Sequence, residues 1–130
     1  MHWGNGTEDI IQRLNLDYVK HFSLARDIRK HKTSQDFIDN LDDSLFHQLE
    51  DVDILFYQAG ADPHVNDPLG GLFTTEQMKE RDRIVFQFAK DMDIPLVWNL
   101  AGGYQETVSK VVDLHLETLS AYFEVFKNKG

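Results

Sequence analysis

The run of residues 54–59, Ile-Leu-Phe-Tyr-Gln-Ala, constrains the fold of this chain more than any other stretch. It is largely apolar and stops at Gly60, with Asp62 and Pro63 just beyond. A short apolar run bounded by turn residues predicts a buried strand of a parallel sheet. Ligands of open α/β sheets bind beyond the carboxyl ends of the strands, which makes Asp62 a candidate functional residue. Asp before Pro is also a common turn residue, so a purely local role for Asp62 stays open.

A second apolar run at residues 94–100 predicts another buried strand, with Pro95 at its start, where a missing N–H donor is tolerated. A glycine turn at residues 101–104 follows it and ends in Tyr104. Residues 18–23 alternate weakly and predict a further strand. Because parallel strands bring their carboxyl ends to one edge of a sheet, we expect Asp62 and Tyr104 to converge.

Helical spacing of apolar residues predicts helices after Thr7, over residues 34–49, over residues 74–92 and over residues 108–126. Thr74 and Gln77 match a capping box. Residues 24–33 are expected to be a basic loop, and His115 a hydrogen-bonded structural residue on an apolar helix side. The alternation of strand and helix predicts a single domain over residues 1–130, a three-layer αβα fold with a mainly parallel sheet.

The composition narrows the function. The 130 residues carry a formal net charge of −9, which argues against direct nucleic-acid binding. There is no cysteine, so a metal site must use histidine and carboxylate ligands. No apolar run is long enough to span a membrane and no signal peptide is evident, so the expected location is the cytoplasm. The turn at residues 101–104 is too short to be a nucleotide-binding fingerprint.

Five motifs lie in order along the chain. They are His-Trp-Gly-Asn-Gly-Thr at 2–7, Gln-Ala-Gly-Ala-Asp-Pro-His at 58–64, Asp-Pro-Leu-Gly-Gly at 67–71, Arg-Asp-Arg at 81–83 and Trp-Asn-Leu-Ala-Gly-Gly-Tyr at 98–104. Together they resemble the histone deacetylase family of the arginase/deacetylase superfamily, and especially its bacterial amidohydrolases. The resemblance covers nearly the whole chain and implies an arginase/deacetylase fold, of which this chain would be the C-terminal portion.

The resemblance assigns roles to individual residues. His2 and Asp62 correspond to zinc ligands, and Tyr104 to the catalytic tyrosine that hydrogen-bonds the substrate carbonyl. Gly102 and Gly103 correspond to the loop beside a narrow substrate channel. Asp67 is expected to shape its loop, and His64 is expected to be exposed and has no assigned role. The implied chemistry is hydrolysis of the amide of acetyl-lysine or of a small acylated amine, with Zn²⁺ polarising the carbonyl and activating water.

The chain also departs from the family pattern. The position of the family's first zinc carboxylate falls before Met1, and none of the six histidines forms a His-His pair. A glycine-rich turn such as residues 2–6 normally follows a strand, so the chain is expected to begin within a fold. Zinc binding should therefore be weak or absent and the isolated chain inactive. The alternative is a non-catalytic deacetylase-like remnant or binding module. Uncovered apolar surface also predicts self-association or marginal stability.

Overall fold

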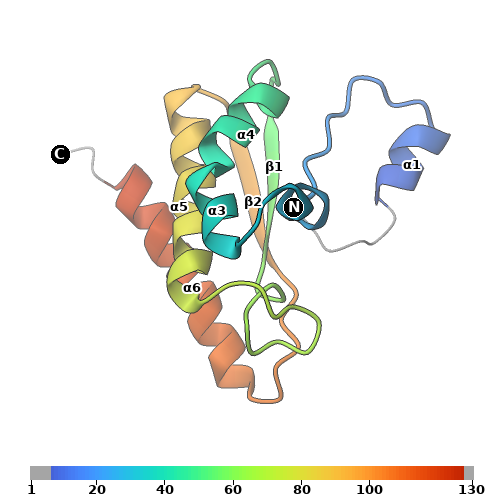
Figure 1. The fold of residues 1–130 in the computed structure, drawn as a ribbon. Helices are drawn as coiled ribbons and strands as arrows, with labels where there is room; N and C mark the ends of the chain where they lie inside the picture. The colour runs from blue at the N-terminus through green and yellow to red at the C-terminus, as the bar shows by residue number, and fades with distance from the viewer. Residues whose placement is uncertain (1–6, 128–130) are drawn as a thin grey trace.

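The structure, a computed structural model, describes residues 7–127, without the side chains of residues 7–9, 24 and 25. Helices and two strands alternate along the second half of the chain, and short helices fill the first half (Figure 1). In chain order the elements are α1 (Thr7–Arg13), α2 (Leu24–Asp27), the 3₁₀ helix η1 (Ile28–Lys30), α3 (Ser34–Asp39), α4 (Leu41–Leu49), β1 (Leu55–Gly60), α5 (Thr75–Asp91), β2 (Leu96–Ala101) and α6 (Val108–Phe126).

The two predicted central strands are confirmed and they pair in parallel, from Leu55 opposite Leu96 to Gly60 opposite Ala101. Pro95 lies just before β2, and its carbonyl accepts a hydrogen bond of 2.9 Å from the N–H of Leu55. The strand predicted at residues 18–23 is wrong, because within residues 7–127 β1 pairs only with β2. Weak alternation does not make a strand where no neighbouring strand supplies ladder hydrogen bonds.

One face of the sheet packs on α5 and α6. Leu55, Tyr57 and Ala59 of β1 point into this core and are 9%, 3% and 1% exposed. Phe86 of α5, with no exposed surface, lies at its centre. Its ring lies edge-on to nearby aromatic rings, with centroids 5.3 to 6.4 Å away, on Tyr57, Trp98, Tyr122 and Phe126. The alternation of buried and exposed residues in β1 therefore follows from one-sided packing of the two strands.

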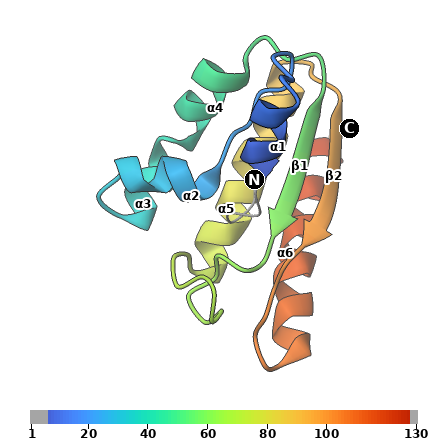
Figure 2. The ribbon, with the colours of Figure 1, turned by 90° about the vertical axis from the view of Figure 1, so that its right-hand side faces the viewer.

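The opposite face of the sheet remains largely open. Phe56 and Val97, which stand opposite each other in the register, are 69% and 50% exposed. Figures 1 and 2 show α3 to α6 on one side of the strands and α1 on the other. The described residues therefore form an α/β fold with a parallel sheet, but they do not close a third layer over Phe56 and Val97.

The first half of the chain differs from prediction in its helices. The helix expected over residues 34–49 is divided at Asn40, whose side chain donates to the carbonyl of Asp36 at 2.8 Å. The expected loop at residues 24–33 contains α2 and η1. These short helices join at the buried Asp27, whose carboxylate accepts a hydrogen bond from Lys30 at 2.7 Å. Contacts such as the Asp27–Lys30 pair depend on single polar residues, so apolar periodicity does not reveal these helical turns.

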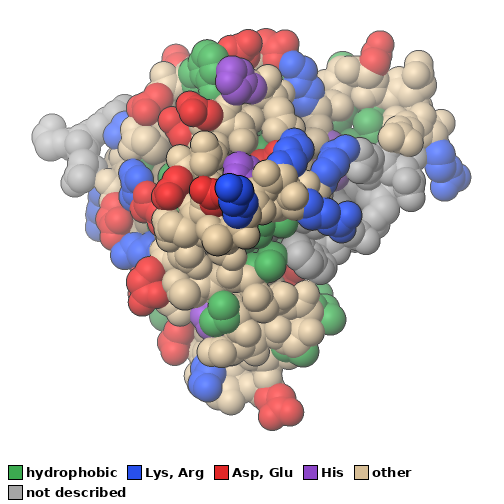
Figure 3. Space-filling view, in the orientation of Figure 1, with side chains coloured by type: hydrophobic (Ala, Val, Ile, Leu, Met, Phe, Trp, Pro, Cys, Tyr) green, Lys and Arg blue, Asp and Glu red, His purple; other side chains and the backbone are tan. Residues whose placement is uncertain are grey.

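Charge is unevenly distributed on the surface. Figure 3 shows Asp and Glu side chains gathered at the top and left of the face, and Lys and Arg side chains gathered near its middle.

The predicted capping box is confirmed, since Thr74 accepts from the N–H of Gln77 at 3.2 Å and Gln77 accepts from the N–H of Thr74 at 3.1 Å. No helix within residues 7–127 has the length and apolar character needed to cross a bilayer.

Candidate functional site

The loops after β1 and β2 meet beyond the ends of the strands, as the sequence predicts. The N–H of Ala61 donates to the carbonyl of Ala101 at 2.8 Å, which extends the strand pairing by one hydrogen bond. Asp62 and Gly102 follow directly. A Cβ atom placed on Gly102 would lie 2.0 Å from Oδ1 of Asp62, so the carboxylate packs against the backbone of the loop that follows β2.

Glycine is required at positions 102 and 103. Both residues have positive φ angles, +58° and +104°, which side chains disfavour. A Cβ on Gly103 would also lie 2.4 Å from Cγ1 of Val111 and 3.2 Å from Cβ of Ala61. The sequence suggested that these glycines allow backbone to approach a substrate channel. The structure gives them a more immediate reason, which is the space taken by Asp62 and Val111.

A buried ion pair lies beneath the start of the Asp62 loop. Arg81 and Asp82 of α5 are each 1% exposed. Nε of Arg81 donates to Oδ1 of Asp82 at 2.8 Å, and Nη2 lies 2.7 Å from the same oxygen without hydrogen-bond geometry. Nη1 of Arg81 donates to the carbonyl of Gly60 at 2.9 Å. The guanidinium therefore anchors the end of β1, two residues before Asp62.

Two further buried side chains complete this network. The hydroxyl of Tyr57 donates to Oδ1 of Asp82, and the hydroxyl of Thr118 donates to Oδ2 at 2.6 Å. Burial tends to lower the pKa of Arg81, but the nearby Asp82, Tyr57 and Asp62 outweigh it and raise that pKa. Burial, reinforced by Asp82, raises the pKa of Tyr57 well above its ordinary value. Sequence reasoning noted the Arg-Asp pair only as part of a motif, since burial of adjacent charges leaves no signal in hydrophobic periodicity.

His64 lies inside the loop after β1, contrary to the prediction that it is exposed; its exposure is 6%. Nδ1 accepts from the N–H of Asn66 at 3.1 Å, and Nε2 lies 3.1 Å from the hydroxyl oxygen of Thr75. Desolvation lowers the pKa of His64, although Asp67 and Glu76 act in the opposite direction. A neutral ring with its proton on Nε2 satisfies both hydrogen bonds, so the residue stabilises the loop against the start of α5.

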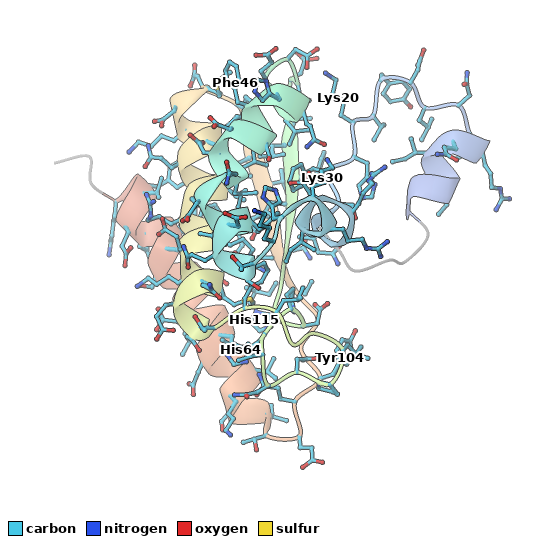
Figure 4. All side chains as sticks on the ribbon, in the orientation of Figure 1. Lys20, Lys30, Phe46, His64, Tyr104 and His115 are labelled. Atoms are coloured by element: carbon cyan, nitrogen blue, oxygen red, sulfur yellow. The ribbon has the colours of Figure 1, made fainter. Side chains whose placement is uncertain are left out.

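Asp67 shapes the same loop, as expected. Oδ1 accepts from the N–H of Leu69 at 2.9 Å and Oδ2 accepts from the N–H of Tyr104 at 2.7 Å. Tyr104 itself is 58% exposed. Figure 4 shows His64 and Tyr104 in the loop region beyond the strands, while His115 comes from α6, where it is half-buried. The predicted carboxylate and phenol thus belong to two loops that are hydrogen-bonded to each other.

The described residues do not by themselves make a zinc site. A catalytic zinc takes three protein ligands. No group of three or more His, Asp or Glu residues within residues 7–127 is arranged to hold a metal ion. Of the two predicted ligands, Asp62 is present at the strand ends and His2 lies outside the described residues. The geometry of the described residues alone therefore supports no reaction step at a metal.

A cavity of about 610 Å³ lies along β1, away from these loops. Its wall includes Tyr18, Phe22, Phe56, Gln58 and Asn99, and it contains neither Asp62 nor Tyr104. It follows the flank of the sheet that α1 faces. The cavity is therefore distinct from the candidate site at the strand ends.

Comparison with known proteins gives the family. A family model described as the histone deacetylase domain matches residues 15–119. Histone deacetylase 2 of Arabidopsis thaliana is 33% identical over 91 residues, which cover 68% of this chain and 24% of that protein. An uncharacterized protein of Picosynechococcus sp. is 30% identical over 131 aligned positions, which cover 88% of this chain and 44% of that protein. The chain spans less than half the length of either relative. The resemblance seen in the motifs is confirmed, and the chain belongs to the histone deacetylase family.

Proposed function

We propose that this chain supplies the carboxylate and phenol side of a deacetylase site that hydrolyses the amide of acetyl-lysine or of a small acylated amine. One observation carries the proposal: the Asp62 carboxylate lies against Gly102, two residues before Tyr104, at the carboxyl ends of two parallel strands. Ligands of α/β proteins bind at such an edge. The arrangement supports the arginase/deacetylase assignment of the fold, whose sheet would have helices on both faces.

Tyr104 and Asp62 have separate roles in this proposal. The phenol of Tyr104, exposed beside the glycine turn, would donate a hydrogen bond to the substrate carbonyl as negative charge develops on its oxygen. Asp62 would be a zinc ligand together with His2. Gly102 and Gly103 leave backbone, without side chains, at the wall of the substrate channel.

The isolated chain should nevertheless bind zinc weakly and hydrolyse no acetyl-lysine peptide. It offers two proposed ligands, and it has no His-His pair to act as general base, a contribution of roughly a hundredfold to ten-thousandfold in rate. Self-association through the open sheet face is part of the same proposal, because Phe56 and Val97 are exposed there.

The test is a zinc titration of the ¹⁵N-labelled chain, followed by NMR and paired with a peptide hydrolysis assay. We expect weak binding that shifts the amide signals near His2 and those of residues 60–62 and 102–104, and that disappears in Asp62→Ala. Asp67 lies in the same loop, but its carboxylate is occupied by two N–H groups, so Asp67→Asn should keep the zinc response of residues 60–62. Zinc-induced shifts elsewhere would refute the site. Tight stoichiometric binding, or chelator-sensitive turnover lost in Tyr104→Phe, would refute the proposed incompleteness.

A further inference from the structure

The carboxylate of Asp67 makes one contact that its own loop does not require. Asp67 is 5% exposed, and Oδ1 accepts from Leu69, two residues further on. That bond alone forms an Asx turn and would account for an aspartate at this position. The other oxygen, Oδ2, accepts from the N–H of Tyr104 at 2.7 Å, across 37 residues of sequence. The short distance is typical of a charge-assisted hydrogen bond.

The backbone before Tyr104 has little conformational preference of its own. Gly102 and Gly103 both have positive φ angles, and glycine reaches many other conformations at low cost. The direction in which the chain leaves Gly103 must therefore be set by contacts. The bond from Tyr104 to Asp67 is the hydrogen bond at the first residue after the two glycines.

Side-chain packing does little to orient Tyr104. Its exposure is 58%, so more than half of the accessible surface of the residue is open to solvent. Asp67, in contrast, lies in a loop with many internal bonds. Its N–H donates to the carbonyl of His64 at 3.0 Å, and its carbonyl accepts from Gly70 at 3.1 Å. A Cβ on Gly70 would lie 1.9 Å from the carbonyl oxygen of Asp62, so Asp67 and Asp62 belong to one closely packed loop.

We propose that Asp67 is a positioning residue, whose carboxylate links the Asp62 loop to the backbone of Tyr104 and so sets where the phenol stands relative to Asp62. The inference rests on the proposed roles of Asp62 and Tyr104. Asp67 touches neither substrate nor metal in this scheme. It acts through Tyr104.

The test measures amide hydrogen exchange in ¹⁵N-labelled wild-type protein and in Asp67→Ser. A serine hydroxyl can still accept from Leu69 but is too short to reach Tyr104. We expect exchange of the Tyr104 amide to become about tenfold faster or more, as loss of a charge-assisted hydrogen bond implies, while the Leu69 amide stays protected. Asp67→Ala, which removes both acceptor oxygens, is the second variant should Asp67→Ser fail to fold, and it should speed exchange at Tyr104 as well as at Leu69. Asp113→Asn removes the same charge from an exposed position of α6 and should change neither amide.

Two outcomes would overturn the proposal. One is an unchanged Tyr104 amide in a folded Asp67 variant. The other is faster exchange throughout residues 7–127 in proportion to a lowered melting temperature, which would show a general structural role. Because exchange requires neither zinc nor turnover, it decides the role of Asp67 even if the zinc titration refutes the proposed function. Conversely, suppose that the zinc response is lost in Asp62→Ala but that the exchange rate of the Tyr104 amide is the same in the Asp67 variants as in wild type. That result would refute only the positioning role.

Discussion

Replacing Arg81 by methionine should destabilise this protein more than any single surface change. Arg81 and Asp82 are each 1% exposed, and Asp82 has no other positive partner among the ion pairs of the described residues. The variant would leave a buried carboxylate with only the hydroxyls of Tyr57 and Thr118 as donors, and the carbonyl of Gly60 without the guanidinium. Breaking a buried pair from one side costs about 3–5 kcal/mol. That is a large part of the roughly 5–15 kcal/mol by which domains are stable.

The chain contains a matched control two residues away. Arg83 also pairs with a carboxylate, that of Glu80 at 2.6 Å, but these side chains are 41% and 42% exposed. An exposed pair of this kind contributes about 0–1 kcal/mol, so Arg83→Met should have a small effect. A second variant, Arg81→Met with Asp82→Asn, removes the buried charge and keeps an oxygen acceptor for Tyr57. It should recover at least about 1 kcal/mol of the loss, because an unpaired buried charge costs more than a neutral amide.

Urea unfolding, followed by circular dichroism and by tryptophan fluorescence, would give the change in unfolding free energy for each of the three variants. Trp98, which packs beside Tyr122, is one of the two tryptophans that report. The reasoning is refuted if Arg81→Met costs no more than Arg83→Met. It is also refuted if the double variant is as unstable as Arg81→Met, since the cost would then come from lost volume rather than from charge.

Three further predictions concern pH, glycine and the open face. The pKa of Tyr57 is raised in the fold, so Tyr57 contributes its full stabilisation below the unfolded pKa of 10.0 and loses it as the pH rises above that value. The free energy of unfolding should therefore fall above pH 10 in wild type and fall less in Tyr57→Phe. Gly102→Ala should destabilise more than Gly71→Ala in urea unfolding, because both have positive φ but only a Cβ at 102 meets Asp62; equal costs would refute the contact. Sedimentation at two concentrations should show self-association that weakens in Phe56→Gln; a wild-type monomer melting above about 65 °C would contradict this.

The elements predicted best are those whose signals are local and redundant. The strands at Leu55–Gly60 and Leu96–Ala101 were expected within two residues, because apolar runs ended by glycine leave few alternatives. The helix Thr75–Asp91 was predicted equally well, since a capping box at Thr74 adds to its apolar periodicity. The convergence of the two strand ends followed from topology alone.

The failures arose where tertiary contacts decide. His64 looked like an exposed loop residue, yet its ring is buried and is hydrogen-bonded to the N–H of Asn66 and the hydroxyl of Thr75. Residues 18–23 carry alternation without a pairing partner. Arg81 and Asp82 entered the sequence analysis only as part of a motif, and the position of α5 beneath Gly60 makes them a buried pair. In each case the determining partner lies in another segment or depends on how a loop closes.

The contacts that set the candidate site are separate from the open face of the sheet. Arg81 anchors the carbonyl of Gly60, Asp62 lies on Gly102, and Asp67 links the loop to Tyr104. All these partners lie within residues 60–104 and on the packed side or the ends of the strands. Phe56 and Val97 lie on the exposed face of the strands, and neither side chain takes part in these three contacts. The geometry of Asp62 and Tyr104 should therefore survive substitution of Phe56 or Val97, because different residues set it.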